Sequence, residues 1–169
     1  MNCFAGGESS AAAAVASKSE VQPRAAEVAA EPSSQLSAED VVRAQMSALA
    51  GEGAVMKRIE RCYRFASPAN REHTGPIEHF AQMVRAPQYA SLLAAKHFLV
   101  GKASQEKDSA FILVTTIDPA GELTLFRFFL SKQTKSPFAG CWMTDAVIRV
   151  GTVKKSGDSE KPLNDGEPI

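Results

Sequence analysis

Arg127 and Asp145 are the two side chains in this sequence whose chemistry is most easily combined. Each lies in a stretch of alternating residues typical of a β-strand, and a connection centred near Ser136 would join the two stretches. That register places Arg127 roughly opposite Asp145 on one face and predicts an ion pair across the strands. Such a pair either fixes the register or an interface, or provides the polar anchors of a small-molecule pocket.

The other reactive residue types lack the partners that catalysis or metal binding needs. The histidines have no helical metal-ligand spacing, and the cysteines have neither a CxxC partner nor a neighbouring base: His73, His79, His97, Cys3, Cys62 and Cys141. We therefore predict no catalytic residue, no metal site and no cofactor. Trp142, the only tryptophan, is expected in the core, and the alternative is that it lines a ligand cavity.

Charge and composition favour an intracellular globular protein. The 169 residues include 19 Lys+Arg and 19 Asp+Glu, so no overall field attracts nucleic acid or a membrane, and we expect neither as a partner. Three widely spaced cysteines fit a reducing compartment, and we expect a cytoplasmic location. Basic residues at helical spacing form a ridge that is expected to face solvent: Lys57, Arg58, Arg61 and Arg64. The alternative is that this ridge binds an acidic partner or RNA.

The chain divides into an arm, a domain and a tail. Residues 1–36 are rich in Ala, Ser and Glu without an amphipathic period, which predicts a disordered arm. If this arm were instead a transit peptide, the protein would be directed to the plastid stroma. Residues 37–150 form the predicted domain, and residues 151–169 are expected to be a flexible tail.

Three helices are predicted in the first half of the domain. The first begins after the N-cap Ser37 and ends at Gly51, and the second spans about 54–66. Residues 67–70, which include Pro68, are expected to end that helix. The third begins with Pro76 at its first position, and a further short helical turn is expected over 89–95.

Four strands are predicted in the second half, at 97–103, 110–117, 122–132 and 141–150. Short connections between them favour an antiparallel meander. The fold class is therefore α+β, with three N-terminal helices packed on a curved four-stranded antiparallel sheet.

Both faces of the last two strands are apolar. Alternation assigns one face to Phe126, Phe128, Leu130, Trp142, Ala146 and Ile148. It assigns the other to Leu123, Leu125, Arg127, Phe129, Met143, Asp145, Val147 and Arg149. Because a solvated face would be polar, we expect a cover on each side and favour a homodimer formed through the sheet.

Three short motifs carry a resemblance to a known family: Phe65-Ala66-Ser67-Pro68, Gly75-Pro76 leading to Phe80 and Met83-Val84, and Gly140-Cys141-Trp142-Met143. Over residues 37–150 the chain resembles a domain-of-unknown-function family of bacteria, plants and algae within the nuclear-transport-factor-2-like superfamily. The resemblance implies a cone-shaped α+β fold. Enzymes of that superfamily place an acid or a histidine in the cone, and the groups offered here are Tyr63, Arg127 and Asp145.

The leading interpretation is a non-enzymatic binding or assembly module that dimerises through the sheet. The alternative is a small lyase or isomerase that acts on an apolar small molecule in the cone cavity, with Asp145 as base. The ligand-binding candidates are Tyr63, Arg127, Trp142 and Asp145. An unpaired Asp145 facing a cavity above about 300 Å³ would favour the enzyme. Pairing with Arg127 at a flat interface would favour assembly.

Overall fold

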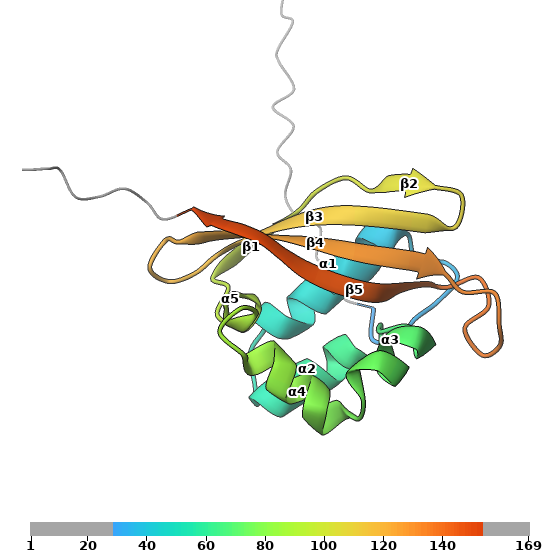
Figure 1. Ribbon diagram of the computed structural model, residues 1–169, viewed down its shortest axis with the longest axis horizontal. Helices are drawn as coiled ribbons and strands as arrows, with labels where there is room; N and C mark the ends of the chain where they lie inside the picture. Colours follow the sequence, from blue (N-terminus) through green and yellow to red (C-terminus); the bar gives the residue numbers. More distant parts are fainter. Residues whose placement is uncertain (1–28, 154–169) are drawn as a thin grey trace, which may run out of the picture.

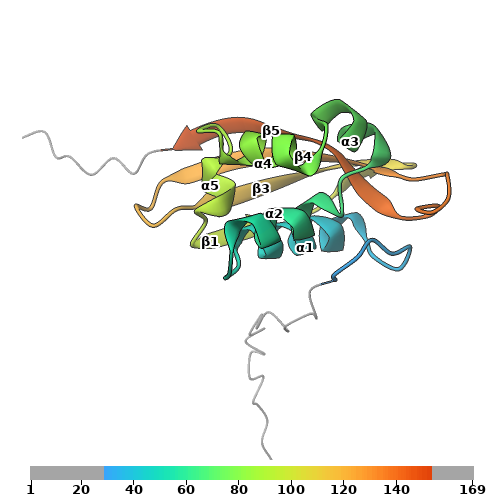
Figure 2. The ribbon, with the colours of Figure 1, turned by 90° about the horizontal axis from the view of Figure 1, so that it is seen from below.

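The computed structural model describes residues 29–153 as a layer of helices packed on one face of an antiparallel sheet (Figure 1). The strand order is β1-β3-β4-β5, with β2 paired to β3. Seen from the helix side, α1 and α2 lie along the β1 side of the sheet, and α3 and α4 lie along the β5 side (Figure 2). No helix within residues 29–153 is long and apolar enough to cross a membrane. The fold class is thus α+β, as predicted.

The first helix begins where the sequence predicts. In α1 (Ala38–Ala50), Ser37 and Asp40 form a reciprocal capping box, and Gly51 is the C-cap. One side of α1 is buried against the sheet, and α2 (Val55–Tyr63) packs beside it with Ile59 and Cys62 buried. The predicted second helix, 54–66, begins one residue before α2 and ends three residues after it.

A short helix follows where we expected only a loop. Ser67 accepts a hydrogen bond from the Asn70 amide, and Pro68 is the first residue of α3 (Pro68–Thr74). The prediction that Pro68 ends a helix was therefore incomplete, because a proline preceded by a Ser cap also begins one. Pro76 is the N-cap of α4 (Ile77–Arg85) rather than its first residue, and α5 (Ala90–Leu93) confirms the predicted short turn.

The sheet has five strands instead of the predicted four. The predicted strand 97–103 is shortened to β1 (His97–Val100), and β2 (Ser104–Glu106) follows where no strand was predicted. Both pair with the same edge of β3 (Ser109–Ile117). The meander then continues through β4 (Leu123–Lys132) and β5 (Trp142–Val153), all antiparallel as predicted.

The core lies between α1, the remaining helices and the inner face of β3 and β4. Its largest members are less than 2 % exposed and include Phe65, Phe126, Phe128 and Met46. Packing also extends beyond the predicted domain boundaries, because Leu36 contacts the core and Glu31 pairs with Arg64 at 2.6 Å. The rest of the predicted arm and tail, residues 1–28 and 154–169, lies outside the described residues.

Candidate functional site

The predicted ion pair between Arg127 and Asp145 does not form. Lys132 pairs with Trp142, so the β4–β5 connection is centred on Pro137 instead of Ser136. The register then shifts by one residue at Asp145, the extra residue of a β-bulge. As a result Arg127 lies opposite Ile148.

The same bulge corrects the predicted faces of β5. Ala146 is paired with Phe129 and Ile148 with Arg127, so both lie on the outer face of the sheet instead of the inner one. Val147, paired with Phe128, turns inward, and its carbonyl accepts a hydrogen bond from the Tyr89 hydroxyl at 3.1 Å. The prediction assumed unbroken alternation, and one inserted residue reverses the side chains that follow it, up to a second register shift between Leu125 and Phe126.

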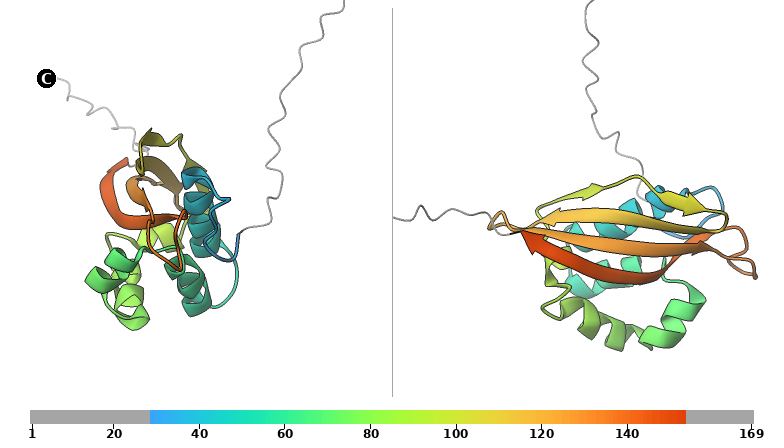
Figure 3. Two further views of the ribbon diagram at one scale, coloured as in Figure 1. Left: turned by 90° about the vertical axis from the view of Figure 1, so that its right-hand side faces the viewer. Right: turned by 45° about the horizontal axis from the view of Figure 1, so that its top comes forward.

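No helix covers the outer face of the sheet within the described chain (Figure 3). We define the outer sheet face by its register positions on β1, β3, β4 and β5: Leu99, Phe111, Leu113, Leu125, Arg127, Phe129, Ala146 and Ile148. Leu99 and Ile148 are 71 % and 52 % exposed, Phe111 and Leu113 are close to 38 % exposed, and Leu125 and Phe129 are half-buried. This is a largely apolar surface spread over four strands, with Thr115 between Leu99 and Leu125.

Arg127 stands in the middle of the outer sheet face without an acidic partner. Its guanidinium carbon is 5.3 Å from the centroid of the Phe111 ring, a cation–π contact. Its Nε is buried and has no hydrogen-bond partner among residues 29–153. Asp145 and Ala146 together oppose Phe129 on the neighbouring strand, and neither Arg127 nor Asp145 belongs to a salt bridge in the described part of the chain.

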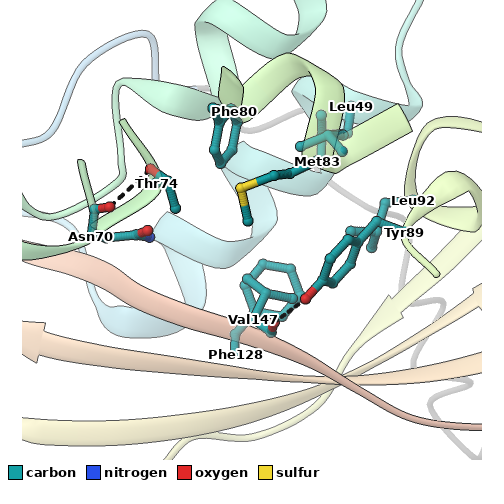
Figure 4. Close-up of a pocket in the computed structure, with 10 residues that line it drawn as sticks. Leu49, Asn70, Thr74, Phe80, Met83, Tyr89, Leu92, Phe128 and Val147 are labelled. Atoms are coloured by element: carbon teal, nitrogen blue, oxygen red, sulfur yellow. Dashed lines mark hydrogen bonds between the residues drawn. The ribbon is translucent and has the colours of Figure 1, made fainter. Parts of the chain in front are cut away.

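A small cavity lies on the opposite, helix-covered side. It has a volume of about 80 Å³ and is bounded by α3, α4 and α5 on one side and by β4 and β5 on the other (Figure 4). Its lining is Leu49, Asn70, Thr74, Phe80, Met83, Val84, Tyr89, Leu92, Phe128 and Val147. None of these is an acid, a lysine, a histidine or a cysteine.

The four ligand-binding candidates from the sequence are not brought together. Tyr63 donates its hydroxyl hydrogen to the Gly75 carbonyl at 2.9 Å and packs its ring 4.9 Å from that of Phe80. Trp142 is a core residue, 6 % exposed. Arg127 lies on the outer sheet face, Asp145 lies at the bulge, and none of the four lines the cavity.

Sequence reasoning missed a buried polar network around Thr144. Its hydroxyl donates to Gln45 Oε1 at 2.6 Å, and its carbonyl accepts from the Ser67 amide and from Asn70 Nδ2 at 2.9 and 3.0 Å. The Thr144 amide donates to the Phe65 carbonyl at 2.9 Å. The network joins the start of β5 to α1 and α3. The only hint in the sequence was a glutamine on the otherwise apolar side of the first helix.

The remaining predicted features are structural. Burial raises the pKa of the Cys62 thiol to about 12, so it stays protonated at neutral pH. In the basic ridge, Arg58 turns inward to the carbonyls of Leu49 and Leu93, and Lys57 pairs with Glu60 at 3.1 Å. Within the described residues, no cluster of three or more His, Cys, Asp or Glu side chains could hold a metal ion.

Comparison with known proteins places the chain in a family. The model of the domain of unknown function DUF4864 matches residues 31–155, which include the whole described domain from α1 to β5. Neither the curated proteins nor the solved structures that were searched gave a match. Because the match covers well over half of the chain, this protein belongs to the DUF4864 family.

Proposed function

We propose that this domain is a non-enzymatic assembly module that forms a homodimer through the outer sheet face. One observation carries the proposal: this apolar surface holds Arg127, Asp145 lies at the bulge opposite Phe129, and neither side chain has a salt bridge within residues 29–153.

The apolar character of the outer sheet face supports a protein partner. An antiparallel sheet with one solvated face normally alternates between apolar and polar residues. Here the outward positions of β3 and β4 include Phe111, Leu113, Leu125 and Phe129. An apolar patch that extends over several strands is typical of an interaction site.

The two charges favour a second copy over an unrelated partner. In a two-fold symmetric interface a residue that contacts a given position is contacted by that position in return. Arg127 of one copy can therefore meet Asp145 of the second, and the second Arg127 meets the first Asp145. Two such pairs would satisfy both charges while the surrounding apolar side chains leave water.

The inner cavity supports a non-enzymatic role. Its volume of about 80 Å³ is well below the roughly 300–1,000 Å³ of ordinary small-molecule sites. Its lining contains no carboxylate or imidazole to act as general base, and its one phenol, Tyr89, donates to a backbone carbonyl. No specific observation favours the lyase or isomerase alternative.

We also propose membership of the nuclear-transport-factor-2-like superfamily. The support is architectural: N-terminal helices cover one face of an antiparallel sheet, and the opposite face is left without helices. An experimental structure of this protein whose strand order differs from β1-β3-β4-β5 would contradict this placement.

Oligomeric state tests the assembly proposal directly. Sedimentation velocity at micromolar concentration should give a dimer for the wild-type chain and a monomer for Leu113→Glu, because the new charge would be buried in the interface. Val55→Glu is the matched control, since Val55 is 39 % exposed on α2 in the helical layer. It should remain a dimer. A wild-type monomer would overturn the proposal.

A charge exchange tests the pairing itself. Arg127→Asp and Asp145→Arg should each weaken dimerisation, because each places two like charges at the same contact. The double variant restores opposite charges and should recover most of the wild-type affinity. If the double variant associates no better than the single ones, Arg127 and Asp145 do not face each other across the interface.

A further inference from the structure

The cavity under α4 and α5 is apolar except at three side chains. Asn70 and Thr74 come from α3, at one side of the cavity, and Tyr89 comes from the residue before α5, at the other (Figure 4). Phe80 and Met83 of α4 lie across from Phe128 and Val147 of the sheet. A ligand that enters would contact mainly carbon and one sulfur atom.

The two hydroxyl groups of the cavity have already donated their hydrogen atoms. Thr74 Oγ1 donates to the Asn70 carbonyl at 2.8 Å, and Tyr89 Oη donates to the Val147 carbonyl at 3.1 Å. Each of these oxygens can therefore act toward a ligand only as an acceptor.

The Asn70 amide adds a third acceptor. Its Nδ2 donates to the Thr144 carbonyl at 3.0 Å. Because a carbonyl oxygen only accepts, this bond fixes which end of the amide is nitrogen. Oδ1 is left without a hydrogen-bond partner in the described structure, and the amide end of Asn70 reaches toward the cavity (Figure 4).

We infer that this cavity binds a small, neutral, apolar molecule that carries one hydroxyl group, which donates its hydrogen to Asn70 Oδ1. Neutrality follows from the absence of any charged side chain in the lining. The hydroxyl hydrogen complements Asn70 Oδ1, which has no hydrogen-bond partner within residues 29–153. The inference is independent of the proposed dimer, because the cavity lies on the inner side of the sheet.

Size limits the ligand. The volume of about 80 Å³ is about half of the roughly 150 Å³ of a dry cavity that takes up benzene. An alcohol of one or two carbons therefore fits as the structure stands. 1-Butanol is about as large as benzene, so it enters, as a ring does, only when Met83 moves, which its flexible side chain allows.

An isomer pair tests the inference without assuming a natural ligand. 1-Butanol and methyl propyl ether have the same atoms, but only the alcohol donates a hydrogen bond. In a titration of protein with 13C-labelled methionine methyl groups, the Met83 signal should shift saturably with 1-butanol. The ether should bind about three- to tenfold more weakly, as expected for one lost hydrogen bond. Equal binding of the two isomers would overturn the role of Asn70 Oδ1.

Two variants test the location. Val147→Phe fills the cavity and should abolish the saturable shift, whereas Val150→Phe, on an exposed position of the same strand, should leave it unchanged. Met83→Ala enlarges the cavity and should strengthen binding, observed through the signals of Tyr89. If Val147→Phe does not fold, the Met83→Ala result decides alone. Unchanged affinity in Met83→Ala, or no saturation with either isomer in the wild type, would mean that the cavity holds only water.

Discussion

The two faces of the sheet carry similar side chains but are covered to very different extents. On β4 alone, Phe126 and Phe128 are at most 1 % exposed on the inner face, and Leu125 and Phe129 on the outer face keep part of their surface accessible. The helices pack only on the first face. Alternation thus identifies two apolar faces, and residues 29–153 cover only one of them; the proposed dimer would cover the other.

Phe128→Ala compared with Phe129→Ala should give the largest difference between the faces. Phe128→Ala removes a fully buried ring and should lower the free energy of unfolding by about 3–5 kcal/mol. Phe129→Ala should lower it by about 1 kcal/mol, because its ring is only partly withdrawn from water. Urea unfolding in the Leu113→Glu background measures both without a contribution from dissociation. Equal losses would mean that the outer sheet face is packed as tightly as the core.

The fold was largely predictable because its strongest signals are local. The capped start of α1, its end at Gly51 and the period-two pattern of the sheet are all properties of neighbouring residues. The missed helix α3 has the same kind of signal. Ser67 and Pro68 were interpreted only as an end to α2, although this pair also caps and begins a helix.

The arrangement around Arg127 was not predictable from alternation. One inserted residue at Asp145 changes which side chains share a face, and no residue type marks a bulge in an apolar strand. The Thr144 network escaped for a different reason. Its members come from three separate segments, and only the packed fold brings Gln45, Ser67 and Asn70 to the same residue, Thr144.

A comparison of Thr144→Val with Thr115→Val extends the contrast between the inner and outer faces to polar side chains. Thr144 is 1 % exposed, and loss of its hydroxyl leaves Gln45 Oε1 buried without its donor. The free energy of unfolding should fall by about 1–3 kcal/mol. Thr115→Val, on the outer side of β3, should change it by about 0.5 kcal/mol or less. The double variant Gln45→Leu with Thr144→Val should lose less than the sum of the two single losses.

The contact between Arg127 and Phe111 should contribute less than either of these inner-face effects. A double-mutant cycle with Arg127→Met and Phe111→Leu, measured by urea unfolding in the Leu113→Glu background, should give a coupling of about 0.5–1 kcal/mol. A coupling near zero would mean that the aromatic ring does not hold the guanidinium in the monomer.

The smallest effect on stability is expected at Glu39, which lies where α1 meets the sheet edge between β1 and β2. The Ala103 amide donates to Glu39 Oε1 at 3.0 Å, and this bond to the carboxylate lowers the pKa of Glu39 from its usual value of 4.5. A lowered folded-state pKa contributes stability that is present above the unfolded value and is lost as pH falls through the folded one. Thermal unfolding of wild type and Glu39→Gln should therefore differ at neutral pH and converge as pH falls below about 4.5.

Glu106→Gln on the exposed strand β2 is the control, because Glu106 accepts no side-chain hydrogen bond within residues 29–153. If the Glu39→Gln difference persists unchanged to pH 3, the bond to Ala103 does not depend on the charge of the carboxylate, and this edge is held by packing alone.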